Sequence, residues 1–321
     1  MLLRASVKMK NNTSIIRKSF DFLSVLRCWQ LYLMLLLPLI YIIIFAYIPM
    51  LGIQLAFRQY SADSGIFGGQ WVGFKYFVRF FKDYQFARVL VNTLTISFYA
   101  LFAGFPLPIL LALILNSARS QILKKTVQMV SYMPHFISTV VMVGIIMQVF
   151  NTRIGLYGKL LSLLDLPAVD LLGKASAFPS LYVWSGVWQN MGWGSIVYLA
   201  ALSNVSPELH EAAMIDGASR FKRLIHIDIQ AILPTACILL IMNCGQIMNV
   251  GFEKAFLMQN PLNLRTSELI STYVFKTGLT AGGGGDFSYA TAIGLFNSVI
   301  NLILLVVVNQ IAKKFGDTSL W

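Results

Sequence analysis

Amide and tryptophan side chains interrupt several otherwise apolar stretches of the sequence, and their chemistry is the most informative in the chain. They are Trp184, Trp188, Gln189 and Asn190 in one stretch, Asn243, Gln246, Asn249 and Glu253 in a second, and Asn297 and Asn301 in a third. Amides donate and accept hydrogen bonds, and tryptophan offers a large apolar ring that can stack on the apolar face of a sugar. A wet cavity lined in this way would suit a neutral or weakly charged polyhydroxylated solute.

The second stretch carries the clearest pattern. Its four polar residues recur at spacings of three and four, which predicts one shared face of a helix. In lipid a polar side chain is costly unless it faces protein or water. For any single residue the simpler interpretation is a hydrogen bond between neighbouring helices, worth about 0.6–2 kcal/mol. For the ten residues together we predict a solute path.

Other kinds of chemistry find little support. The three cysteines Cys28, Cys237 and Cys244 form no CxxC pair and have no metal-ligand spacing. The glycine run Gly282–Gly285 is not followed by Lys-Ser or Lys-Thr, so it is not a phosphate-binding loop, and we interpret it as a flexible linker. No nucleophile, acid–base pair or ligand cluster converges within the apolar stretches. We therefore predict no catalytic residue, no metal site and no cofactor in this chain.

Composition indicates which elements must position these residues. Of the 321 residues 57% are hydrophobic and 12% charged, whereas soluble domains carry about 25% charged residues. The sequence therefore predicts an all-α polytopic membrane protein. A transmembrane helix needs about 20 apolar residues. Six stretches meet that requirement: Leu31–Phe57, Val89–Leu115, Thr126–Phe150, Phe178–Leu202, Ile232–Phe256 and Tyr289–Ala312.

Charge indicates the orientation of these helices. Residues 1–29 form a basic N-terminal segment with six Lys or Arg and one acidic residue, which predicts a cytoplasmic N-terminus. Six spans over residues 30–321 would return the C-terminus to the same side. The basic turn Ala118–Lys125 supports this order, although the longer loops show no clear bias. In a membrane protein the net charge of +12 is better explained by loops near lipid head groups than by nucleic acid.

A hydrophilic insert, residues 203–231, separates the fourth and fifth predicted spans. Ser206 is a good helix N-cap, Pro207 suits the first helical position, and Glu208 suits the positive end of the helix dipole. Gly217 interrupts the pattern, and a second amphipathic run begins near Phe221. We predict two short helices joined at Gly217 that protrude on the cytoplasmic side.

The insert resembles a known family motif. Glu211-Ala-Ala, three further residues, Gly217, nine further residues and Ile227 resemble the EAA loop of membrane subunits of binding-protein-dependent (type I) ABC importers. The family usually continues Ile-x-Leu-Pro, whereas here the proline arrives only at Pro234, which affects the exit of the second helix. Residues 249–258 (NVGFEKAFLM), 286–301 (DFSYATAIGLFNSVIN) and the final Ser-Leu-Trp are similar to carbohydrate-uptake permeases. Within them the chain resembles the branch that imports oligosaccharides from plant or algal polysaccharides.

This resemblance implies a type I ABC importer permease fold in a bacterial inner membrane. It also implies a second homologous permease, a dimer of ATP-binding subunits that would bind ATP and Mg, and an extracytoplasmic solute-binding protein. ATP-driven closure of the ATPase dimer would then swing the permeases between inward- and outward-facing states. The residues that would form the coupling helix and its break are Glu211, Ala212, Ala213, Asp216 and Gly217.

Two questions stay open on the sequence alone. An acidic oligosaccharide would need basic groups near the path, and Lys254, Arg265 and Lys276 fall near its predicted outer side rather than in mid-span. An ion-coupled secondary transporter of a small polar solute is the alternative function. It is disfavoured by the long insert and by the lack of carboxylates in mid-membrane.

Overall fold

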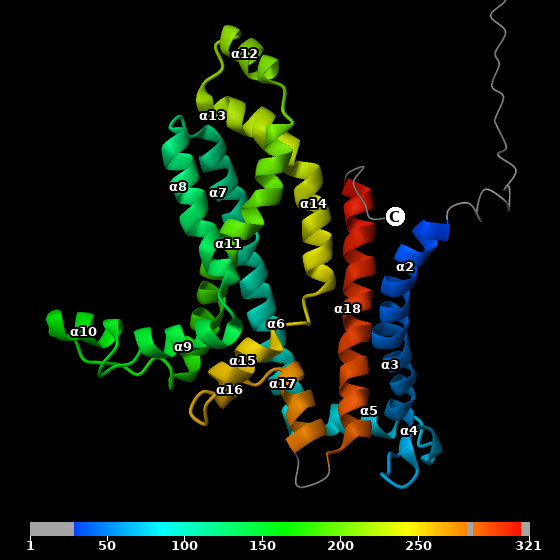
Figure 1. Cartoon of the computed structure of the whole chain (residues 1–321). Helices are drawn as coiled ribbons and strands as arrows, with labels where there is room; N and C mark the ends of the chain where they lie inside the picture. Colours follow the sequence, from blue (N-terminus) through cyan, green and yellow to red (C-terminus); the bar gives the residue numbers. More distant parts are fainter. Residues whose placement is uncertain (1–28, 281–284, 316–321) are drawn as a thin grey trace, which may run out of the picture. The chain divides into compact units, whose positions relative to one another are not determined.

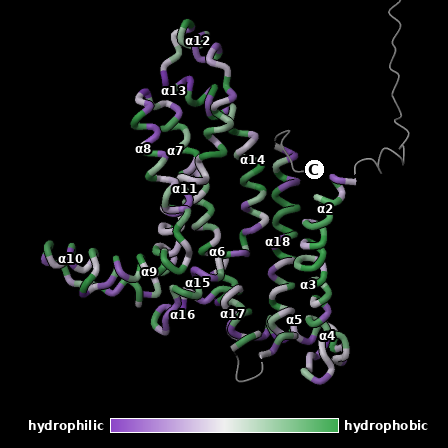
Figure 2. Tube along the Cα trace, in the orientation of Figure 1, coloured by the Kyte–Doolittle hydropathy of each residue, from purple (hydrophilic) through white to green (hydrophobic). Residues whose placement is uncertain are grey.

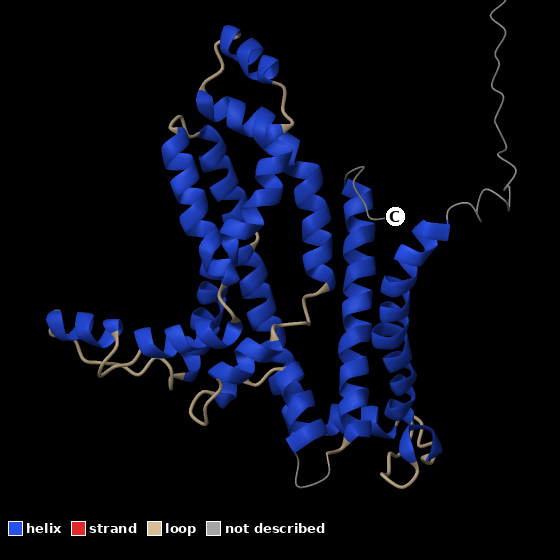
Figure 3. Ribbon diagram, in the orientation of Figure 1, coloured by secondary structure: helices blue, strands red, loops and turns tan. Residues whose placement is uncertain are grey.

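The computed structural model describes residues 29–280 and 285–315. The basic N-terminal segment up to residue 28, most of the Gly282–Gly285 run and the final Ser-Leu-Trp therefore lie outside the described residues. Within those two ranges every regular element is helical, and β pairing is limited to isolated bridges between Arg58 and Trp71 and between Ser61 and Gly65 (Figure 3). The predicted all-α class is confirmed for this part of the chain.

The chain divides into two units, Met1–Gly52 and Ile53–Trp321. In the first, α2 (Trp29–Ile42) runs into a π-helical turn (η1, Ile43–Tyr47) and the short α3 (Ile48–Met50). The wider turn closes with a hydrogen bond from the Ile48 N–H to the Ile43 carbonyl, immediately before Pro49, which has no N–H to donate. None of these side chains is buried. An apolar helix exposed on all sides is typical of a segment surrounded by lipid or by another membrane helix.

The second unit contains the remaining elements. In chain order they are η2 (Leu51–Phe57, which begins in the first unit), α4 (Gly65–Gly68), α5 (Lys75–Lys82), α6 (Tyr84–Gly104), α7 (Pro106–Ser117), α8 (Gln121–Tyr132), η3 (Met133–Phe136), α9 (Thr139–Val149), α10 (Leu156–Leu163), η4 (Ala175–Ala177), α11 (Phe178–Ser203), α12 (Pro207–Ile215), α13 (Arg220–Arg223), η5 (Leu224–Asp228), α14 (Ile229–Gly245), α15 (Phe252–Met258), α16 (Leu264–Ser267), α17 (Ile270–Phe275), η6 (Lys276–Thr280) and α18 (Phe287–Phe315).

Helix α11 is central to the packing of this unit. It contacts α6, α7 and α8, while α14 packs on α18 (Figure 1). The contact with α8 is very close, since a Cβ atom on Gly192 would lie 2.1 Å from the Ser131 carbonyl oxygen. Small residues permit such approach between membrane helices, so Gly192 sets the spacing of this pair.

Among the described residues, four helices are long and apolar enough to cross a membrane, or five if a bent pair counts as one span. They are Trp29–Phe57, Tyr84–Ser117, Arg220–Gly245 and Phe287–Lys314, and the bent pair joins Gln121–Phe136 to Thr139–Val149. The predicted span Phe178–Leu202 does form a helix, α11, whose 26 residues extend about 39 Å. It is not among the four because polar residues lower its hydropathy (Figure 2). The count of six therefore stays a prediction.

The predicted span Thr126–Phe150 is a bent pair of helices rather than one straight helix. Helices α8 and α9 meet at an angle of 104° across η3. Pro134 in η3 cannot donate a backbone hydrogen bond, and α9 starts anew with Ser138, whose Oγ accepts from the Val141 N–H at 3.4 Å. Pro134 therefore accounts for the end of the first helix, and the Ser138 N-cap accounts for the start of the second.

The prediction of one helix over Ile232–Phe256 is wrong. Helix α14 ends at Gly245, a turn follows, and α15 begins at Phe252. A Cβ atom on Gly245 would lie 2.4 Å from Leu305 Cδ1, so the end of α14 presses closely on α18. Consequently Asn243, Gln246, Asn249 and Glu253 do not share one helical face.

Candidate functional site

Helix α12 forms the tip of the insert, as its capping residues predict (Figure 1). The Ser206 Oγ accepts a hydrogen bond from the Glu208 N–H at 3.3 Å. At the other end Gly217 has φ +75°, the left-handed conformation that favours glycine. The Gly217 N–H donates to the Met214 carbonyl at 3.1 Å and the Ala218 N–H donates to the Ala213 carbonyl at 2.8 Å. These two bonds make a Schellman C-cap, so the chain turns sharply at the predicted break.

Most of the side chains of α12 point into solvent. Glu211, Ala212 and Asp216 are exposed, and Ala213 is half-buried. Three large apolar side chains are also exposed, Leu209 at 55%, Met214 at 52% and Ile215 at 87%. Apolar groups at the tip of a charged loop are unusual for a free surface and are typical of an interaction site.

One polar contact joins α12 to the base of the helix that follows it. The His210 Nε2 lies 3.3 Å from Asp228 Oδ1, and Asn116 Nδ2 lies 3.4 Å from the same oxygen. Asp228 is only 5% exposed. The insert is thus fixed to the end of α7 and to the start of α14, beside a hollow of about 810 Å³ that Arg119, Arg220 and Arg223 also line.

The second half of the insert differs from the prediction of a separate short helix. Residues from Arg220 to Gly245 form one helical run, with a π-helical turn at Leu224–Asp228. The helix passes through Pro234 without ending. The proline that departs from the family pattern therefore lies inside a membrane-length helix and does not set the exit of the loop.

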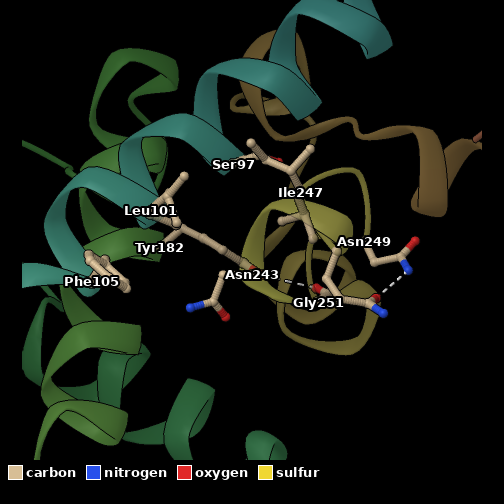
Figure 4. A pocket seen from close by; sticks show the side chains of 12 residues that line it. Ser97, Leu101, Phe105, Tyr182, Asn243, Ile247, Asn249 and Gly251 are labelled. Atoms are coloured by element: carbon tan, nitrogen blue, oxygen red, sulfur yellow. Dashed lines mark hydrogen bonds between the residues drawn. The ribbon is translucent and has the colours of Figure 1, made fainter. Parts of the chain in front are cut away.

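Three of the predicted path residues come together where α14 ends. Asn243, Gln246 and Asn249 line a cavity of about 360 Å³ with Ser97 and Tyr182 (Figure 4). All three amides are exposed in this chain taken alone.

The amides at this cavity are also connected to one another. Asn297 Nδ2 donates to Asn249 Oδ1 at 3.1 Å, and Asn249 Nδ2 donates to Gln246 Oε1 at 2.7 Å. Asn297 belongs to α18, so the chain of amides links two helices to the rim of the cavity.

Asn301, also on α18, is buried and bonded to the backbone of the turn after α14. Its Oδ1 accepts a hydrogen bond from the Met248 N–H at 2.9 Å, and the residue is only 7% exposed. The backbone after Gly245 has left the helix, so its N–H groups need new acceptors. Asn301 supplies one such acceptor and stabilises the turn, and it is not among the residues that line the cavity.

A second cavity, of about 300 Å³, lies beside α11. Gln189, Asn190, Tyr182 and Lys254 line it, and Tyr182 is shared with the first cavity. Gln189 Nε2 donates to the Ile137 carbonyl at 2.8 Å.

Two other predicted path residues, Asn190 and Glu253, differ in their surroundings. Asn190 Oδ1 lies 3.0 Å from His135 Nδ1, and that ring stacks on Trp193. Glu253 is exposed on α15 and is not among the residues that line the two cavities.

The two predicted tryptophans lie apart from these amides. Trp184 and Trp188 line an apolar hollow of about 500 Å³ with Met142, Ile146 and other residues of α9. The Trp184 Nε1 donates to Tyr99 Oη at 2.8 Å. The structure therefore does not bring the tryptophans and the amides of α11 into one cavity.

The sequence placed Lys254 only near the outer side of the predicted path, and it gave no indication that Tyr182 lines a cavity. Lys254 is 8% exposed, and its Nζ donates to the Tyr182 carbonyl at 2.8 Å. The two residues are far apart in the sequence, so no local spacing could have paired them. The only available signal was a lysine directly after an otherwise apolar stretch.

A carboxylate at the start of α6 belongs to a separate network of hydrogen bonds. Asp83 accepts from the Gln85 N–H at 2.9 Å and from the hydroxyls of Tyr273 at 2.7 Å and Tyr289 at 2.9 Å. Burial would raise the pKa of the Asp83 carboxyl, but these hydrogen bonds outweigh it and hold the pKa below its ordinary value. Burial, together with the bond to Asp83, raises the pKa of Tyr273 to about 12.

A second group of charges lies close to this network. Glu268 pairs with Arg88 and with Lys276, and its side chain is only 9% exposed. Over the described ranges, no three His, Cys, Asp or Glu side chains are grouped so that they could hold a metal ion.

Known proteins share this architecture. Residues 104–317 match the family described as "Binding-protein-dependent transport system inner membrane component", and the chain belongs to that family. Among its relatives, Protein LplB of Bacillus subtilis (strain 168) is 42% identical over 291 residues, which cover 91% of both chains. The "Polygalacturonan/rhamnogalacturonan transport system permease protein YteP" of the same organism is 40% identical, over 91% of this chain and 90% of its own.

Two solved structures are similar over most of the chain. One is a chain of "a bacterial ABC transporter involved in the import of the acidic polysaccharide alginate", with TM-score 0.83 and 38% identity over 91% of this chain and 97% of its own. The other is a chain of the alginate transporter "in complex with alginate pentasaccharide-bound periplasmic protein", with TM-score 0.85 and 37% identity over 94% of this chain and 99% of its own. The resemblance to importer permeases, and to that of the alginate importer, is confirmed.

Proposed function

We propose that this chain is the permease subunit of an ATP-driven importer that moves an oligosaccharide from a solute-binding protein into the cytoplasm. Its partners would be a second homologous permease, a dimer of ATPase subunits that binds ATP and Mg, and the binding protein. The N- and C-termini and the insert would lie in the cytoplasm. Alginate or another acidic oligosaccharide is the substrate that the relatives' own names favour.

The observation that carries this proposal is the construction of α12. A short helix, capped at Ser206 and ended by a Schellman turn at Gly217, presents Ile215 and other apolar side chains at the tip of the loop. A preformed helix of this kind can enter a hydrophobic groove of a partner with little loss of conformational entropy. The partner in this position would be the ATPase.

The same construction suggests how movement would be transmitted. His210 contacts Asp228, which directly precedes α14 in the helical run that begins at Arg220, and α14 ends at the amide-lined cavity. A displacement of α12 by the closing ATPase would therefore reach the cavity through one continuous helix. Ala212 and Ala213, being small, would permit close approach to the partner, and Glu211 and Asp216 would be available for polar contacts at its rim.

Affinity purification of the tagged chain from its native host tests the proposal. We expect an ATPase and a second permease to be recovered in mild detergent, and to be lost from variants Glu211→Lys and Gly217→Pro that still insert in the membrane. Asp63→Lys reverses an equally exposed charge in the loop that precedes α4 and serves as the control, because it should leave recovery unchanged. A stable assembly without an ATPase would reject the proposal and favour ion-coupled transport.

A further inference from the structure

Lys254 is a buried cation without a counter-charge. The residue is 8% exposed, and its Nζ lies 4.7 Å from the centroid of the Tyr182 ring. Its hydrogen bond goes to an uncharged acceptor, the Tyr182 carbonyl, at 2.8 Å. The ion pairs among the described residues include other lysines and arginines but not Lys254, so no described carboxylate lies within 4.0 Å of its Nζ.

This arrangement costs free energy in the absence of a ligand. Removing an ammonium group from water is compensated only when an opposite charge or several hydrogen bonds replace the solvent. A carbonyl and an aromatic face offer partial compensation. An ammonium group has three N–H donors, and the carbonyl of Tyr182 takes only one of them. The remaining donors are available to the cavity that Lys254 lines.

The surroundings of Lys254 are built to admit a polar ligand. The cavity of about 300 Å³ also contains the amides Gln189 and Asn190 and the open flank of α11 at Gly186. A Cβ atom on Gly186 would lie 3.2 Å from Lys254 Nζ, so the glycine leaves room for the ammonium group. By contrast, the cations Arg88 and Lys276 both form ion pairs with the carboxylate of Glu268.

We propose that Lys254 is the specificity-determining cation of the solute path, where its ammonium group binds a carboxylate of an acidic oligosaccharide. This inference rests on the proposed import function and adds to it the residue that distinguishes charged from neutral sugars. A sugar carboxylate would supply the missing counter-charge, and the neighbouring amides would bind hydroxyl groups. Neutral sugars would leave the ammonium group unpaired and so bind less tightly.

The test is equilibrium binding to the purified transporter, with both permeases and the ATPase present and the solute-binding protein absent. The probes are an alginate pentasaccharide and a pentagalacturonate, each with a methyl-esterified counterpart that lacks charge. We expect wild type to bind at least one acid more tightly than its ester. We expect Lys254→Met to weaken binding of that acid roughly 10- to 100-fold, the range for a charge-assisted hydrogen bond, and to leave binding of the ester unchanged.

Two further variants keep the test decisive. Lys174→Met removes an exposed lysine from the loop that precedes α11. It should leave the affinities for acid and ester as in wild type. Lys254→Arg keeps the charge and should keep the preference for acid over ester. This variant serves as the test if Lys254→Met does not assemble. An unchanged preference in Lys254→Met, a lost preference in Lys254→Arg, or no preference in wild type would overturn the inference. None of these outcomes affects co-purification with the ATPase, on which the import function depends.

Discussion

The imidazole Nε2 of His210 lies 3.3 Å from Oδ1 of Asp228, and this contact joins the exposed helix α12 to the helical run that begins at Arg220. Asp228 is buried, and Asn116 at the end of α7 reaches the same oxygen. The contact therefore gathers three helices at one carboxylate. A force applied to α12 would be passed to two helices of membrane length.

We predict that His210→Ala weakens coupling without preventing assembly. Loss of a partner from a largely buried carboxylate costs about 1–3 kcal/mol, which would loosen α12 relative to α14. In reconstituted transporter, stimulation of ATP hydrolysis by the loaded binding protein should fall at least several-fold while the ATPase still co-purifies. His226→Ala is the control, since His226 is exposed in the same region and its ring hydrogen-bonds within its own helical run, at the Lys222 carbonyl. Equal stimulation in the two variants would exclude a transmitting role for His210.

A second prediction concerns the turn at Gly217. Its φ of +75° is accessible to glycine but costs an L side chain about 1 kcal/mol, so Gly217→Ala should fray the end of α12 and reduce uptake. Gly144→Ala adds the same methyl group inside α9, where nothing lies within 4 Å of the new atom. Uptake by the Gly144 variant should match wild type. Full uptake by Gly217→Ala at normal expression would show that the left-handed turn is dispensable.

The local structure of the insert could be predicted from the sequence because its signals are local. Ser206, Pro207 and Gly217 act on the few residues beside them, and the structure has the expected cap and break. The polar stripe could not be predicted, because α14 ends where Gly245 presses against Leu305, a residue of another helix. That contact depends on tertiary packing, which spacing along one segment does not contain.

Two further parts of the candidate site were hidden for the same reason. The Lys254 side chain reaches the Tyr182 carbonyl on α11, so its burial depends on a residue far away in the sequence. Trp184 and Trp188 share a helix with Gln189 but lie over α9, because successive positions of one helix face different neighbours. Residue type predicted what these side chains could bind, whereas their grouping required the structure.

The asparagines near the end of α14 allow binding to be separated from stability. Asn301→Leu removes the acceptor of the buried Met248 N–H and should lower the free energy of unfolding by about 1–3 kcal/mol. Asn249→Ala breaks the amide chain at the cavity rim and should weaken sugar binding roughly fivefold, with little change in the melting temperature. Thermal unfolding and sugar binding of both purified variants check this. A shared loss of stability would assign both residues to the scaffold.

The last prediction concerns acid stability. The pKa of Asp83 is lowered in the folded protein because three hydrogen bonds to its carboxylate outweigh burial. A lowered folded pKa means that the stabilisation is fully present above the ordinary value of 3.8 and is lost as pH falls through the lowered value. Asp83→Asn should therefore reduce stability at neutral pH by about 1–2 kcal/mol and flatten the loss of stability below pH 4.

Thermal unfolding of the detergent-solubilised protein at a series of pH values measures this effect. Asp63→Asn is the matched control, because Asp63 is exposed and belongs to none of these bonds. Tyr273→Phe removes one donor and should reproduce part of the loss, since the Tyr289 hydroxyl still reaches the same oxygen. If Asp83→Asn and Asp63→Asn lost stability in parallel as the pH falls, the hydrogen bonds to Asp83 would not be what holds α17 and α18 to the start of α6.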